Sequence, residues 1–126
     1  MGMGYSACTA WTIDDKDCQK LCRKPWNNMM AALADKNMSL DELAQTLNWD
    51  GEVPDYILDA LNAFTKAFEK KTGLPIGLYF HNADEEGDRY DDINGHYWDL
   101  SEVSRLTPKA KKLGKKIRFS TWVNFG

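Results

Sequence analysis

Residues 54–81 read PDYILDALNAFTKAFEKKTGLPIGLYFH, and the hydrophobic period of this stretch changes partway along. Its first part carries an apolar stripe at spacings of four, three and four residues, the pattern of an amphipathic helix (Ile57, Leu61, Phe64 and Phe68). Proline at position 54 suits a helix start, and Gly73 followed by Pro75 ends the helical pattern. Residues Ile76–His81 then alternate between the two faces of a predicted strand. A long helix followed at once by a strand is the centre of the predicted fold.

Strands are also predicted at both ends of the chain, because Tyr5–Ile13 and Ile117–Phe125 alternate in the same way. Between them lie a short helical pattern after Asp15 and a second one from Trp26 to Asn37. A capping box, Ser39-Leu-Asp-Glu42, opens a helix that runs to Leu47, and Thr107-Pro108 opens a short lysine-rich helix. This order predicts an α+β fold, a mostly antiparallel four- to five-stranded sheet with three to four helices packed on one face. Residues 1–126 are expected to form one domain.

A β-hairpin is predicted at Asn94-Gly95, since both positions tolerate a positive φ. It would pair Ile93 with His96 and Asp91 with Trp98.

The composition is that of a globular protein, with 43% hydrophobic and 28% charged residues among 126. The longest unbroken apolar run is Met29–Ala34, far below the roughly 20 residues that cross a bilayer. Three cysteines, Cys8, Cys18 and Cys22, form an odd set without a secretory signal. We therefore expect a soluble, cytoplasmic protein without a membrane segment or a disulfide framework.

Charge is segregated along the sequence although the net charge is only −3. Residues 84–99 hold seven acids and one arginine, whereas residues 105–118 hold seven bases and no acid. Such segments pair with each other or face partners of opposite sign.

The acidic hairpin is the first candidate for a functional surface. It combines carboxylates with aromatic side chains, which are frequent at the centres of protein interfaces. The expected contact residues are Asp84, Glu85, Asp88, Tyr90, Asp91, Asp92, Tyr97 and Trp98. Trp49 is a further aromatic residue that falls in a predicted turn. The chain is accordingly predicted to be a non-enzymatic interaction, inhibitor or adaptor module whose partner is another protein.

A nucleic-acid-binding role is the main alternative, because a run of bases followed by an aromatic residue can hold a phosphate backbone. The residues concerned are Lys109, Lys111, Lys112, Lys115, Lys116 and Trp122. The order of elements over residues 39–113 also resembles a winged-helix regulator, with residues 55–71 as its recognition helix and residues 88–89 at the tip of its wing. Asp55 and Asp59 near the start of that helix depart from the pattern of a DNA-binding surface.

A hydrolase-like site centred on His81, beside the acidic stretch, is a third hypothesis. The sequence contains no nucleophile elbow, glycine-rich phosphate loop or zinc-protease motif. Asp92-Ile-Asn-Gly95 matches only the middle of a calcium-binding loop, and the spacing of Cys18 and Cys22 does not complete a common zinc framework. No cofactor, metal ligand or catalytic residue is therefore assigned from the sequence.

Overall fold

The long central helix, α4 (Asp55–Thr72), forms as its apolar stripe predicts. Its four stripe residues, Ile57, Leu61, Phe64 and Phe68, are all buried. The helix begins directly after Pro54 and ends at Gly73, whose φ of 76° is in the left-handed region that glycine adopts without strain. The coordinates are a computed structural model in which residues 5–82, 93–100 and 108–125 are described.

The remaining helices are α1 (Asp15–Leu21), α2 (Arg23–Asp35), α3 (Leu40–Asn48), α5 (Pro108–Lys111) and the 3₁₀ helix η1 (Gly114–Lys116). Ser39 caps α3 as predicted, because the backbone N–H of Glu42 donates to Ser39 Oγ at 3.1 Å. The Glu42 side chain meets the Ser39 hydroxyl, with Ser39 Oγ 3.4 Å from Glu42 Oε1. Asn37 has a φ of 54° and ends α2 in the left-handed conformation.

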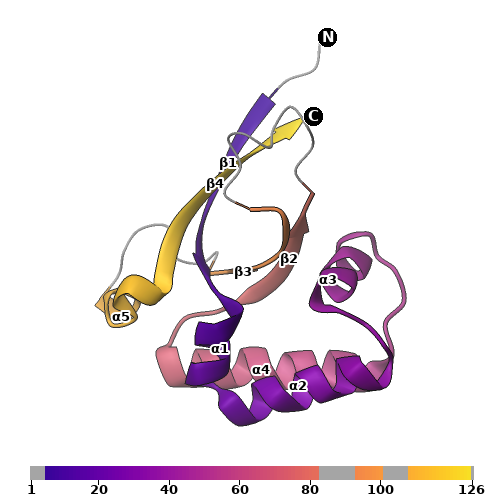
Figure 1. The fold of residues 1–126 in the computed structure, drawn as a ribbon. Helices are drawn as coiled ribbons and strands as arrows, with labels where there is room; N and C mark the ends of the chain where they lie inside the picture. Colours follow the sequence, from indigo (N-terminus) through magenta and orange to yellow (C-terminus); the bar gives the residue numbers. More distant parts are fainter. Residues whose placement is uncertain (1–4, 83–92, 101–107, 126) are drawn as a thin grey trace.

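The sheet contains β1 (Tyr5–Ile13), β2 (Gly77–His81), β3 (Gly95–Asp99) and β4 (Ile117–Phe125) in the order β2-β3-β1-β4. All neighbouring strands are antiparallel, and β1 pairs with β4 along its whole length. Helices α1, α2 and α4 form a layer on one side of the sheet, while α3 lies beside β2 and β3 (Figure 1). The predicted α+β class is confirmed.

The core lies between the sheet and this helical layer. Its largest fully buried side chains include Trp98 of β3 and Phe64 of α4, whose ring centroids are 5.0 Å apart. Trp26 of α2 packs against both, at 5.6 Å from Trp98 and 5.3 Å from Phe64. Aromatic side chains from three elements thus hold the sheet onto the helices.

The predicted hairpin at Asn94-Gly95 is wrong. Gly95 does have a positive φ of 112°, but it is already the first residue of β3. In the sheet Trp98 is the register partner of Leu78 on one side and of Ile13 on the other, so it cannot pair with Asp91. The Asn94-Gly95 pattern concerns only the residues of the turn. It does not reveal that β2 pairs with β3.

The winged-helix arrangement is also not the one observed. β1 lies in the middle of the sheet, between β3 and β4, and comes from outside the range that resembles such a domain. Helix α4 packs along α2 instead of projecting as a recognition helix (Figure 1). No helix among the described residues is long and apolar enough to cross a membrane.

Candidate functional site

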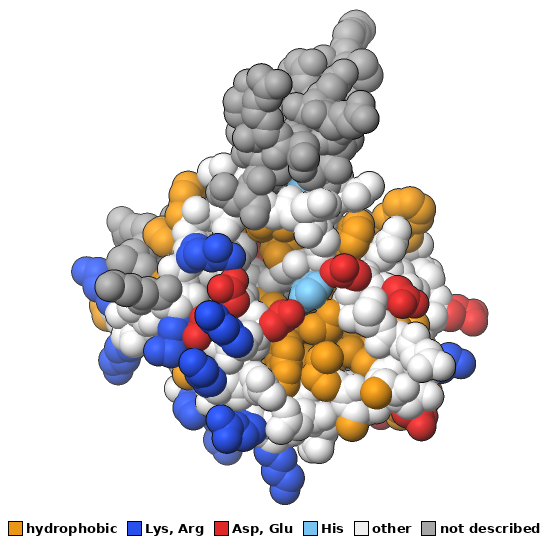
Figure 2. All heavy atoms as spheres, viewed as in Figure 1, with side chains coloured by type: hydrophobic (Ala, Val, Ile, Leu, Met, Phe, Trp, Pro, Cys, Tyr) orange, Lys and Arg blue, Asp and Glu red, His pale blue; other side chains and the backbone are white. Residues whose placement is uncertain are grey.

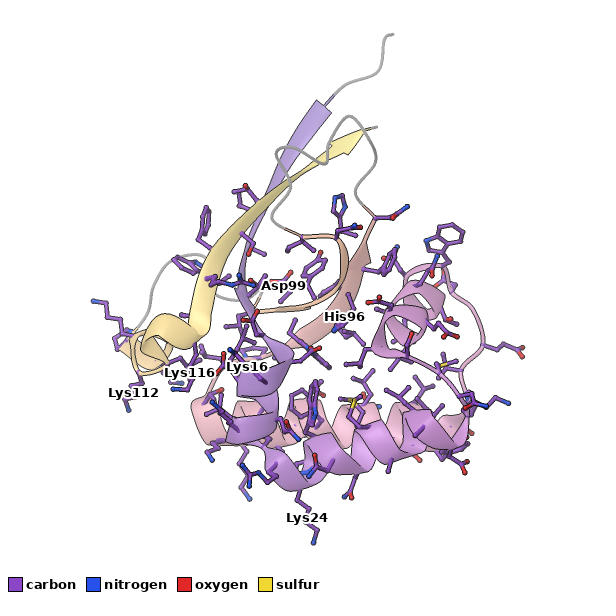
Figure 3. All side chains as sticks on the ribbon, in the orientation of Figure 1. Lys16, Lys24, His96, Asp99, Lys112 and Lys116 are labelled. Carbon is purple, nitrogen blue, oxygen red and sulfur yellow. The ribbon has the colours of Figure 1, made fainter. Side chains whose placement is uncertain are left out.

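A histidine held between two aspartates is the main polar cluster of the described structure. His96 Nε2 lies 2.9 Å from Asp15 Oδ2, in the first turn of α1, and His96 Nδ1 lies 2.5 Å from Asp41 Oδ1, in the first turn of α3. The backbone N–H of His96 also donates to Asp41 at 3.0 Å. Trp98 Nε1 donates to Asp15 at 2.7 Å, so the cluster ties β3 to two helices. Figure 3 shows His96 on β3, between α1 and α3.

These contacts favour the protonated form of His96 and the ionised form of Asp41. The hydrogen bond to Asp15 raises the pKa of His96, burial opposes the rise, and the bond to Asp41 adds to it. The hydrogen bonds from His96 hold the pKa of Asp41 below its usual value. Each ring nitrogen of His96 faces a carboxylate, so these contacts stabilise the imidazolium, the form in which both nitrogens donate.

The arrangement suits a structural clamp better than catalysis. In the protonated form both nitrogens of His96 donate to carboxylates, so the ring has no lone pair to accept a proton or bind a metal. The two carboxylates also lie against opposite nitrogens of the ring, so they do not converge on one point. Among the residues the structure describes, no group of three or more His, Cys, Asp or Glu side chains could hold a metal ion.

The clamp predicts a stability profile with a maximum in pH. The raised pKa of His96 contributes stability below its unfolded value of 6.5, and this contribution is lost as the pH rises through the folded value. The lowered pKa of Asp41 contributes stability above pH 3.8, and this contribution is lost as the pH falls through the folded value.

We expect His96→Gln to lower the free energy of unfolding by about 1–2 kcal/mol near pH 6, and by less at lower and at higher pH. Urea unfolding at a series of pH values measures this, and Asp41→Asn should give the same profile. A pH-independent difference would contradict the clamp.

A cavity of about 460 Å³ lies beside the clamp, between the ends of β1 and β3. Asp14, Lys16, His96, Tyr97 and Arg118 are among the residues that line it. Arg118 Nη2 is 2.7 Å from Asp14 Oδ1, so these two charged side chains of the cavity wall form an ion pair. The cavity thus has polar walls whose charges are partly paired.

The prediction that Trp98 belongs to the contact surface is wrong. It is 1% exposed and lies in the core, so it cannot present itself to a partner. Strand alternation separates Trp98 and Tyr97 correctly, but alternation does not say which face the helices cover. Tyr97 is half-buried on the opposite face, where its ring is 5.9 Å from that of Tyr79.

The other predicted site residues have mixed outcomes. Asp84, Glu85, Asp88, Tyr90, Asp91 and Asp92 lie outside the described residues, as do the side chains of Lys115 and Trp122. Lys109, Lys111, Lys112 and Lys116 are all exposed. His81 is half-buried at the end of β2, where it is the register partner of Gly95, and the alternation of β2 and β3 places it on the face opposite to His96. The structure therefore does not bring the two histidines together.

An acid-rich corner of the molecule was not identified from the sequence as a surface. Residues 35–59 contain seven acids and one lysine, and they cover the end of α2, all of α3 and the start of α4. We call this surface the acid end (Asp35, Asp41, Glu42, Asp50, Glu52, Asp55 and Asp59, with Trp49 and Tyr56). Acidic side chains are spread over the side of the molecule that carries α3 (Figure 2).

Trp49 is the most exposed large apolar side chain of this corner, at 73%. It sits in a tight turn after α3, where Asp50 has a φ of 55° and the N–H of Gly51 donates to the carbonyl of Thr46 at 2.8 Å. A Cβ on Gly51 would lie 2.7 Å from Thr46 Cγ2, so the turn is closely packed. The indole is thus presented on an ordered support.

The two described thiols are core groups. Cys18 and Cys22 are free and buried, and burial is the main cause that raises the pKa of each. Because thiol–disulfide exchange proceeds through the thiolate, neither group is set up for it.

No known family model matches the chain, and no solved structure matches it. A protein of Schizosaccharomyces pombe named "Putative protein disulfide-isomerase" is 29% identical to it over 115 residues. That alignment covers 85% of this chain but 21% of the yeast protein, so the chain spans about a fifth of its relative's length.

Proposed function

We propose that this chain is a protein-binding module, an inhibitor or adaptor, whose acid end binds a partner protein with a basic surface. The observation that carries the proposal is Trp49, an exposed indole in a closely packed turn whose next residues include Asp50 and Glu52. Tryptophan is the residue type most enriched among interface hot spots. Carboxylates around such an anchor accelerate association with a basic partner and disfavour acidic ones.

The acid end contacts the start of β3, at Gly95 and His96. Asp41 of α3 accepts the backbone N–H of His96, and a Cβ on Gly95 would lie 3.2 Å from its Oδ1. Gly95 and His96 follow closely after residues 84–92 in the chain. We propose that the acidic segment, residues 84–92, contacts the same partner as the acid end. The contact role of Asp84, Glu85, Asp88, Tyr90, Asp91 and Asp92 stays a prediction.

Disulfide exchange, the activity that the name of the yeast relative suggests, is not proposed for this chain. Its described thiols are buried and their pKa values are raised. A binding role requires no reactive thiol, and similarity to part of a longer protein is compatible with one.

The charge requirement can be tested by affinity capture with quantitative mass spectrometry. We expect Asp50→Asn with Glu52→Gln to lower capture of the partner on the order of threefold or more, with a smaller difference in high salt. Asparagine tolerates the left-handed conformation at position 50, so the turn should be kept. Asp17→Asn with Glu69→Gln removes the same charge from α1 and α4 and is the matched control. Charge reversal at Asp88, Asp91 and Asp92 together tests the predicted role of the acidic segment, residues 84–92.

Equal capture by the acid-end variant and the control would contradict the proposal, because a non-specific charge effect does not depend on position.

A further inference from the structure

Basic side chains from three separate stretches of sequence lie at the other end of the helical layer. They come from the end of α1 and the start of α2, from the end of α4, and from the segment that runs from α5 to η1. We call this surface the basic end (Lys20, Lys24, Lys70, Lys71, Lys109, Lys112 and Lys116), and all seven side chains are exposed. Lysine and arginine gather on the side of the molecule that carries α1 and α5, with Lys112, Lys116 and Lys24 around it (Figures 2 and 3).

Contacts between these elements support this assembly. A Cβ on Gly73, at the end of α4, would lie 2.9 Å from Lys109 Cδ and 3.2 Å from Lys109 Nζ, so α5 sits against the end of α4. Burial raises the pKa of Cys22 and the charge of Lys71 lowers it, which places Lys71 beside the junction of α1 and α2. The ion pair of Arg118 with Asp14 joins the start of β4, directly after η1, to the start of α1.

The basic end and the acid end are opposite ends of an antiparallel helix pair. Tyr56, at the start of α4, donates to Asp35, at the end of α2, at 3.2 Å. Lys71, at the end of α4, lies near Cys22, just before α2 begins. The length of α4, 18 residues or about 27 Å at 1.5 Å per residue, therefore separates the two surfaces.

The chemistry of the basic end differs from that of a protein interface. Within the described part of the chain, its amino groups form no ion pair with a carboxylate. Among the residues that the structure describes, the large exposed apolar side chains lie elsewhere: Met30 and Tyr56 towards the other end of α2 and α4, Trp49 after α3, Tyr79 on β2 and Phe119 along β4. A protein interface needs an apolar centre, whereas binding to a phosphate backbone needs clustered, accessible cations.

We propose that the basic end binds the phosphate backbone of nucleic acid without reading its sequence. This goes beyond the proposed protein-binding function and uses the opposite surface, so either proposal can fail alone. The basic end also goes beyond the run of bases in residues 105–118, because it includes Lys71, which lies 38 positions before Lys109.

Fluorescence anisotropy with a labelled 20-base-pair duplex, and with one of its strands, tests this proposal with the full chain. We expect saturable binding at 50 mM salt and an affinity that falls steeply as salt rises. Lys71→Gln and Lys112→Gln should each reduce the slope of log K against log salt by about one. Lys36→Gln, which removes an exposed lysine from the acid end, should leave the slope unchanged.

Four results would overturn the proposal. The first three are no saturable binding at 50 mM salt, an equal effect of Lys36→Gln, and an effect of Lys112→Gln without one of Lys71→Gln. Polyglutamate that displaces the duplex as well as unlabelled duplex does, at equal charge, would also overturn it and point to an acidic protein. Circular dichroism melting of each variant shows whether its fold is kept.

Discussion

Replacing Trp98 by alanine is expected to lower the free energy of unfolding by about 3–5 kcal/mol. The indole is 1% exposed and contacts the rings of Trp26 and Phe64, so its removal leaves a large cavity in the core. It also leaves Asp15 without the Trp98 Nε1–H donor, 2.7 Å away in the wild type. Urea denaturation followed by circular dichroism measures the change, and an unchanged m-value shows that the two-state comparison is valid.

Two further variants separate packing from the hydrogen bond. Trp98→Phe keeps most of the ring volume and loses the indole donor, and we expect it to cost less than Trp98→Ala. Trp49→Ala should change stability by less than about 0.5 kcal/mol, because that side chain is 73% exposed. If the Trp98→Ala protein is as stable as the wild type but no longer binds the partner, Trp98 is a contact residue and its assignment to the core is contradicted.

Replacing Trp49 by alanine is expected to weaken partner binding by about 30- to 1000-fold, the effect of losing about 2–4 kcal/mol at an interface hot spot. The expectation follows from the exposure of the indole, its closely packed turn and the carboxylates around it. Surface plasmon resonance with the captured partner gives the dissociation constant of each variant.

Tyr79→Ala is the matched control, since Tyr79 is an exposed aromatic residue on the face of β2 that points away from the core. If Tyr79→Ala weakens binding as strongly as Trp49→Ala, the outer face of the sheet belongs to the interface. If only Tyr79→Ala weakens it, the acid end is not the binding surface.

Local signals in the sequence were sufficient for most of the fold. The stripe of α4, the capping box at Ser39 and the alternation of β4 each involve residues a few positions apart, and each element forms at the predicted place. The hairpin failed because Asn94-Gly95 indicates a turn but not the partner of the strand that follows.

The functional surfaces depend on contacts between distant residues. His96 meets Asp41 and Asp15 across 55 and 81 positions, and no short-range pattern indicates such a meeting. Trp98 shows the same limit, because a period of two separates the faces of a strand without saying which one the helices cover. The sequence run of lysines likewise does not show that Lys71 lies beside α5.

Hydrogen exchange of the chain alone and in complex with its captured partner tests the central claim most directly. We predict that the complex slows amide exchange in residues 41–56, around Trp49, and leaves the amides of residues 66–72 at the end of α4 unchanged. Protection confined to the end of α4 and to α5, with none around Trp49, would contradict the assignment of the acid end as the protein-binding surface.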